Sequence, residues 1–182
     1  MEEYAYILDY LPQGIQGGFG KKEPLCYALG DEEFKLFELV PKANASVAIG
    51  VRTFIGKDTA TEKRDVIDHV KRRINYDDLT NNAMAELEYA VTDIVMSKQE
   101  RFIAFYNTAE SISMKKHLLE ELPGLGKKYM TAILDERKKS LFKDFNDLSE
   151  RTGIKKPEKL IVDRILLEIS DKDRKRYLFV TR

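Results

Sequence analysis

The chain has 182 residues, of which 43% are hydrophobic, so it is long and apolar enough to bury a core and is not expected to be disordered. The 31 basic residues balance 31 acidic ones, and this zero net charge by itself argues only weakly against nucleic-acid binding. No apolar run approaches the roughly 20 residues of a membrane helix and no signal sequence is recognisable, so we expect a cytoplasmic protein without membrane contact.

The sequence predicts a β domain over residues 1–76. Strands are expected at residues 4–11, 25–29 and 34–40 and within 46–55, with a glycine-rich loop over residues 13–22. Residues 62–76 fit both a helix and a strand by their apolar spacing, and a strand that closes a small barrel is preferred. Gly50 and Gly56 beside the fourth strand are typical of the bends that such barrels need.

The fourth strand carries candidate ligand contacts. Arg52 and Lys57 could hold phosphates on either side of Phe54, which could stack on a base. The alternative is that Phe54 belongs to the core, where most such aromatic side chains lie.

Helices are expected from residue 77 onward. Residues 77–110 contain a helix entry at Asp77 to Thr80, a clear 3.6-residue apolar stripe, and a second helix around residues 100–106. Helices are then expected at 112–121, 127–139, 147–152 and 157–169, which together form an all-α domain over residues 111–170. The tail at 171–182 contains a β-rich run, residues 177–180, that is expected to pair with the N-terminal sheet. The predicted fold class is therefore α+β.

The most informative run is Leu122-Pro123-Gly124-Leu125-Gly126-Lys127-Lys128, which joins two of the expected helices. Two glycines allow a tight turn with positive φ, and the N–H groups that open the next helix point outward with the positive end of its dipole. Such a corner binds anions. Lys127 and Lys128 gain nothing from the dipole there, so their position favours an external phosphate.

This run resembles the helix-hairpin-helix motif, which holds DNA or RNA phosphates largely without reading sequence. Gly124, Leu125, Gly126, Lys127 and Lys128 are therefore the first candidate phosphate contacts. A second, degenerate hairpin at residues 153–156 lacks the paired glycines but offers Lys155 and Lys156. The alternative for the first run is a tight helical corner whose glycines only end one helix and start another.

The charge distribution points to the same region. Residues 1–60 carry a net charge of −3, residues 61–110 another −3, and residues 111–182, with 18 basic and 12 acidic side chains, a net +6. The basic excess therefore lies in the third of the chain that contains the hairpins.

Catalytic and metal-binding patterns are sparse. Cys26 is the only cysteine and lies in an apolar stretch, so a buried, inert thiol is expected. His69 and His117 are far apart and lack the partners of a zinc site. Adjacent acids such as Asp77 and Asp78 usually cap helices. The sequence therefore predicts no cofactor, no metal and no enzymatic site.

Four segments, residues 4–14, 37–42, 55–57 and 73–80, followed by the glycine-lysine run, resemble in order an archaeal family, the domain of unknown function 655. The resemblance covers nearly the whole chain. It implies a small OB-like β-barrel ahead of helix-hairpin-helix elements, nucleic-acid binding, and a gene neighbourhood of translation and transcription that favours RNA.

The resulting hypothesis is a non-enzymatic protein that grips a nucleic-acid backbone, with RNA preferred. Its alternatives are a protein that binds branched DNA and an adaptor that docks on a protein of the ribosome or RNA polymerase machinery.

Overall fold

The computed structural model describes residues 1–17 and 22–182, and the expected loop at 13–22 therefore lies partly outside the described residues. The chain divides into two compact units. Unit 1 comprises Met1–Ala90 together with Glu168–Arg182, and unit 2 comprises Val91–Leu167. The division falls inside α1 (Asn81–Ser97) and α5 (Pro157–Ser170), whereas the sequence suggested boundaries at residues 76, 110 and 170.

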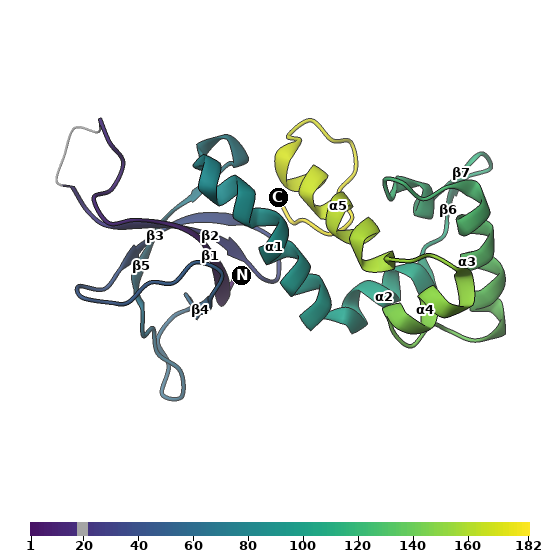
Figure 1. Ribbon diagram of the computed structural model, residues 1–182, viewed down its shortest axis with the longest axis horizontal. Coiled ribbons are helices and arrows are strands. Elements are labelled where there is room, and N and C mark those ends of the chain that lie inside the picture. Colours follow the sequence, from purple (N-terminus) through teal and green to yellow (C-terminus); the bar gives the residue numbers. More distant parts are fainter. Residues whose placement is uncertain (18–21) are drawn as a thin grey trace. The chain divides into compact units, whose positions relative to one another are not determined.

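Unit 1 is built on a curled antiparallel sheet (Figure 1). Its strands follow the order β4-β1-β2-β3-β5. Their bounds are Tyr4–Leu11 for β1, Leu25–Gly30 for β2, Leu36–Pro41 for β3, Arg52–Phe54 for β4 and Ile67–Ile74 for β5. The structure thus confirms the strand preferred for residues 62–76, and it shortens the fourth strand to three residues.

Small and branched side chains form the buried core cluster of this sheet. The fully or nearly fully buried members are Ala5, Ile7, Cys26, Ala28, Leu39, Ile55 and Ile67. A bulge between Ile7 and Asp9 bends β1, as bulges do where a sheet curls.

Strands β4 and β5 are the two edges of the sheet, and one side chain bridges the gap between them. The Arg64 guanidinium donates to the carbonyls of Ile55 and Gly56, which follow β4, and to the carbonyl of Asp68 in β5, at 2.7–3.1 Å. The curled shape of the sheet is therefore stabilised by hydrogen bonds from one side chain, at the place where a closed barrel would have backbone hydrogen bonds between its two edge strands.

The C-terminal segment, residues 171–182, corrects one prediction. Residues 177–180 form no strand, although they are described throughout. The N–H groups of Leu178, Phe179 and Val180 donate to the Glu168 carboxylate at 2.7, 3.0 and 2.9 Å. Because these donors are taken by a side chain, they cannot enter a ladder, and only Thr181 donates to a backbone carbonyl beside the sheet, that of Glu33.

Unit 2 is mainly helical. It contains the end of α1, α2 (Gln99–Thr108), the two-stranded ribbon β6 (Ser111–Ser113) and β7 (Lys116–His117), the 3₁₀ turn η2 (Leu118–Glu121), α3 (Lys127–Lys139), α4 (Phe145–Thr152) and most of α5. The helix expected at 127–139 is confirmed with the same bounds, and those expected around 100–106, 147–152 and 157–169 are also present.

The helix expected at 112–121 is wrong. Its residues form β6, β7 and η2 instead. Local hydrogen bonds explain the difference, because the Ser113 hydroxyl accepts from the N–H of Lys115 in the ribbon turn and His117 Nδ1 accepts from the N–H of Leu119 at the start of η2. Met114 at the ribbon tip is fully exposed, which is unlike a residue of an amphipathic helix.

Three arginines join the elements of unit 2. Arg137 of α3 donates to the carbonyls of Tyr106 and Ala109 at the end of α2. Arg151 of α4 donates to the carbonyls of Glu136 and Ser140 at the end of α3. Arg164 of α5, only 1% exposed, donates to the backbone and side chain of Glu121 in η2. These guanidinium groups satisfy helix-end carbonyls and fix how the helices pack.

Among the described residues, none of the helices combines the length and apolar character needed to cross a membrane.

Candidate nucleic-acid interface

The first hairpin loop, residues 122–126, is a tight turn between η2 and α3. The N–H of Leu125 donates to the carbonyl of Leu122 at 3.2 Å, and Gly124 has a φ of +85°. This is a left-handed conformation that a side chain would strain. Gly124 is thus explained by the turn itself.

Gly126 has a different explanation. It is the N-cap of α3 with an extended backbone, φ −75° and ψ 161°, which any residue can adopt. A Cβ built there meets no described atom within 4 Å, so nothing inside the protein excludes a side chain. Ser, Thr, Asp or Asn would cap the helix better. Glycine instead leaves the N–H groups of the first turn without a side-chain acceptor and open to a ligand.

The second hairpin loop, residues 153–156, joins α4 to α5 and repeats the main features of the first. Gly153 caps α4 with a φ of +80°, and its N–H donates to the carbonyl of Ser149. The apolar Ile154 follows it, as Leu125 follows Gly124, and exposed lysines come next. Pro157 then opens α5 at a position where its missing N–H has no effect on helix bonding.

The two loops meet at one cavity of about 370 Å³. Leu125 and Gly124 line it from the first loop and Ile154, Lys155 and Lys156 from the second, although the loops are about 30 residues apart in sequence. Tyr129 in the first turn of α3 also lines the cavity and is 40% exposed. A Cβ added to Gly153 would lie 4.0 Å from the Tyr129 ring, so the backbone of the second loop lies close to the start of α3.

Four exposed lysines surround this cavity or the adjoining start of α3: Lys127, Lys128, Lys155 and Lys156. Within the described part of the chain, none of their ammonium groups has an acidic partner. By contrast, Lys159 and Lys139 form ion pairs with Asp163 at 2.8 Å and with Glu136 at 2.6 Å. We call the two loops with these four lysines the paired-loop surface.

The structure therefore brings together seven of the nine candidate residues and leaves two elsewhere. Arg52 and Lys57 belong to unit 1. The Arg52 guanidinium pairs with the buried Asp31 at 2.7 Å and lies 3.5 Å from the centre of the Tyr4 ring, so it already has structural partners. Lys57 is exposed in the segment after β4.

Sequence reasoning missed Tyr129, Lys159 and Leu160, which also line the cavity. Tyr129 directly follows Lys128, and its position in the first helical turn after the loop predicted to bind phosphate was the available signal. No sequence signal pointed to Lys159 and Leu160, because their position at the cavity depends on how α5 packs beside α3.

The described residues offer neither a reactive thiol nor a metal cluster. Burial raises the pKa of the Cys26 thiol to about 12, with Asp9 adding to the shift, so this cysteine is unreactive near neutral pH. In the residues that the structure describes, no three His, Cys, Asp or Glu side chains are grouped as a metal site would need.

Comparison with known proteins identifies the family. The family model described as "Protein of unknown function (DUF655)" matches residues 1–181. The uncharacterized protein MJ0038 of Methanocaldococcus jannaschii is 44% identical over 180 residues, which is 98% of this chain and 80% of that protein. The crystal structure of Af1531 from Archaeoglobus fulgidus is similar with a TM-score of 0.89 and 40% identity, and the match covers 99% of this chain and 100% of that one. The chain belongs to the DUF655 family.

Proposed function

We propose that the protein binds nucleic acid, with RNA as the preferred ligand, by holding its phosphate backbone on the paired-loop surface. In this proposal η2–α3 and α4–α5 act as two hairpins of the helix-hairpin-helix type, the first with a shortened leading helix. The curled sheet of unit 1 would be the OB-like domain, since its order β4-β1-β2-β3-β5 is that of a five-stranded Greek-key barrel open between β4 and β5.

The observation that carries the proposal is the pairing of the two loops. Each loop has a glycine with positive φ followed by an apolar residue, and both loops line the same cavity. Four exposed lysines for which no acidic partner is found among the described residues lie in its lining or at the adjoining start of α3. A backbone with regularly spaced phosphates matches two neighbouring donor loops better than a single anion does.

The charge of unit 2 supports the same ligand. Unit 2 carries 15 basic and 12 acidic residues, and three of its arginines are used inside the fold. Its remaining attraction for polyanions is therefore concentrated on exposed lysines such as those of the paired-loop surface. Lys127 and Lys128 lie at the positive end of α3, where a bound phosphate would offset an unfavourable position.

Binding of the purified chain to matched single-stranded RNA, double-stranded RNA, single-stranded DNA and branched DNA across a range of salt concentrations tests the proposal. We expect one RNA class to bind best, with log K falling linearly as log salt rises. The double variant Lys127→Gln with Lys128→Gln should weaken binding and lower that slope by about 1.5, at ~0.7 to 0.9 per phosphate contact.

A matched control lies on the same helix. Lys138→Gln with Lys139→Gln removes the same charge about 17 Å along α3, at ~1.5 Å per residue, and should leave the slope unchanged. Equal losses in both double variants would contradict the paired-loop surface. If the protein prefers branched DNA, then branched DNA and not RNA is its ligand. If no nucleic acid binds above background, the remaining hypothesis is an adaptor that binds a protein partner. The labelled RNA should remain intact, because the proposal includes no catalytic step.

A further inference from the structure

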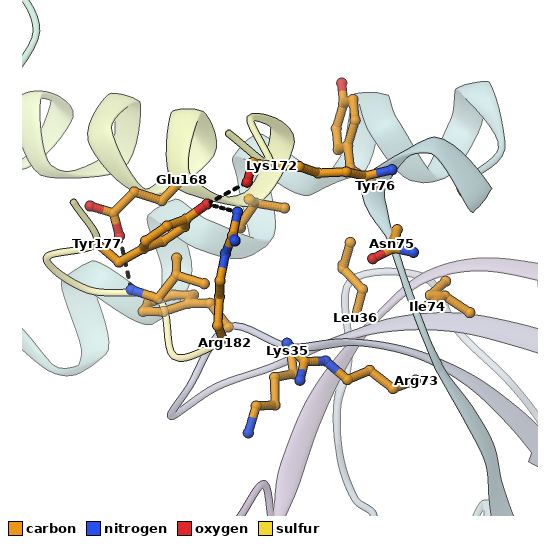
Figure 2. Close-up of a pocket in the computed structure, with 13 residues that line it drawn as sticks. Lys35, Leu36, Arg73, Ile74, Asn75, Tyr76, Glu168, Lys172, Tyr177 and Arg182 are labelled. Carbon is orange, nitrogen blue, oxygen red and sulfur yellow. Dashed lines mark hydrogen bonds between the residues drawn. The ribbon is translucent and has the colours of Figure 1, made fainter. Parts of the chain in front are cut away.

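A second cavity, of about 510 Å³, lies in unit 1 beside the C-terminal segment (Figure 2). Four parts of unit 1 supply its walls. Lys35 and Leu36 come from the entry into β3, residues 73–76 from the end of β5 and the turn after it, Glu168 and Ile169 from the end of α5, and Tyr177 and Arg182 from the C-terminal segment. Its volume is within the range of about 300–1,000 Å³ that is usual for small-molecule sites.

The walls of this cavity are held by specific contacts. Glu168 is only 3% exposed. Its carboxylate accepts hydrogen bonds from the N–H groups of three consecutive residues of the C-terminal segment. Lys172 pairs with Asp77 at 2.5 Å, which ties this segment to the turn after β5. The cavity is therefore formed before any ligand arrives, which lowers the entropy lost on binding.

The side chains that line the cavity carry a net positive charge although the unit is acidic. Unit 1 carries 16 basic and 19 acidic residues, a net charge of −3. The charged residues that line the cavity are four cations and one anion, a net +3: Lys35, Arg73, Lys172, Arg182 and Glu168. A concentration of positive charge against the sign of the surrounding unit favours an anionic ligand.

Two guanidinium groups remain to receive that anion. Lys35 is paired with Glu33 and Lys172 with Asp77, whereas Arg73 has no acidic partner among the described residues. Arg182 contacts Tyr177, through the hydroxyl and with its guanidinium 4.4 Å from the ring centre. In Figure 2, Arg73 extends from β5 toward the side of the cavity on which Arg182 and Lys35 lie. Planar guanidinium groups match phosphate oxygens through paired hydrogen bonds.

The uncharged part of the lining is mostly apolar, with the Asn75 amide and the hydroxyls of Tyr76 and Tyr177 as its polar groups. Leu36 and Ile74, 4% and 5% exposed, form part of the cavity floor between the basic groups. A ligand that fills the cavity should thus combine a phosphate with an organic part that contacts these apolar side chains. We propose that this cavity binds a nucleoside monophosphate, with the phosphate on Arg73 and Arg182 and the base or sugar against Leu36 and Ile74. The phosphate part rests on the cavity alone, and the choice of a nucleoside rests on the proposed function.

Calorimetric titration of the full chain with adenosine 5′-monophosphate tests this site, with adenosine, ribose 5-phosphate and inorganic phosphate as separate probes. We expect saturation with one monophosphate per chain and at least tenfold weaker binding of each other probe. Arg73→Gln and Arg182→Gln should each weaken the monophosphate at least tenfold. Lys71→Gln, on the same strand but outside the cavity lining, should have no effect.

Absence of saturable binding, or an equal loss with Lys71→Gln, would overturn the site, as would equal affinity for inorganic phosphate. Unfolding midpoints equal to that of the unmodified chain show that a variant with weakened binding is still folded. The Lys127→Gln with Lys128→Gln variant should bind the monophosphate normally, so failure here is distinguishable from failure of the paired-loop surface. A 5′-phosphorylated trinucleotide then distinguishes two sources of the ligand. If it binds more tightly than the mononucleotide, the natural ligand is the end of a strand, and if both bind equally, it is a free nucleotide.

Discussion

Gly126 is the residue at which helix stability and ligand access are expected to conflict. Gly126→Ser supplies a good N-cap in open space, so the free energy of unfolding should rise by up to a few tenths of a kcal/mol. The hydroxyl would occupy the N–H groups that we assign to phosphate, and RNA affinity should fall severalfold. Urea unfolding and RNA titration of the same preparation measure both effects, and unchanged affinity would show that no ligand approaches this glycine.

Gly124 provides the opposite pattern. Its φ of +85° would strain alanine by roughly 1–2 kcal/mol, although the added Cβ would lie 3.6 Å from Leu160, an ordinary contact. Gly124→Ala should therefore lower the unfolding free energy by about that amount and weaken RNA binding because the turn shifts. A stability equal to that of the unmodified chain would contradict the assigned backbone conformation.

His117 makes the stability of the first hairpin depend on pH. Burial, with the charge of Arg137 adding to it, lowers the pKa of His117 below its ordinary value of 6.5. Above pH 6.5 the neutral ring accepts the N–H of Leu119, and this contribution is complete. Below pH 6.5 the unfolded chain takes up the proton first, so stability falls as the pH falls toward the lowered pKa of the folded state.

His117→Asn tests this effect, because asparagine caps a helix start without titrating. Urea unfolding at pH 7.5 and at pH 5.5 should show a smaller loss for the variant than for the unmodified chain. The nearby carboxyl groups Glu121 and Glu136 have pKa values below their ordinary value of 4.5 and contribute little in this range. An identical pH dependence of both proteins would argue against the His117 cap.

At the scale of the elements, Arg151 holds α4 against the end of α3. It donates to the carbonyls of Glu136 and Ser140 at 2.7 Å each, and its guanidinium lies 4.5 Å from the centre of the Phe142 ring. A lysine cannot reproduce this planar fork, so Arg151→Lys should reduce the unfolding free energy by about 1.5–3 kcal/mol. Denaturant unfolding measures it, and Lys138→Ala, which removes an exposed side chain of α3, serves as the control with little expected change.

The elements also show what local sequence determines. The strand at Tyr4–Leu11 and the helix at Lys127–Lys139 have the predicted bounds, because their composition and flanking Pro and Gly residues act locally. The helix expected at 112–121 rested on the hairpin motif more than on apolar periodicity, and short-range side-chain hydrogen bonds produced a ribbon and a 3₁₀ turn. The tail was misassigned because its N–H groups bind Glu168, whose position the sequence pattern did not indicate.

At the scale of the whole molecule, the candidate residues were predictable but their grouping was only partly so. The glycine-lysine run identified the first loop without a structure. That the second loop lines the same cavity follows from the packing of α3, α4 and α5, which is fixed by Arg151 and Arg164 and by no sequence motif. The cavity of unit 1 was not predictable, because its walls come from segments about 40 and 100 residues apart.

This grouping predicts how the two loops combine. If both hold one backbone, Lys155→Gln with Lys156→Gln should lower the salt slope of RNA binding by about 1.5, as the pair in the first loop does, at ~0.7 to 0.9 per contact. The fourfold variant should lower it by about 3, since charges released at separate phosphates add.

Stoichiometry distinguishes a shared backbone from two separate strands. With short single-stranded RNA, one strand per chain should saturate the unmodified protein, because both loops line a single cavity. Two strands per chain, with each double variant abolishing one of them, would mean that the loops act independently. An unchanged slope in the second-loop variant would instead restrict the interface to residues 124–128, and Lys155 and Lys156 would then only solubilise the turn before α5.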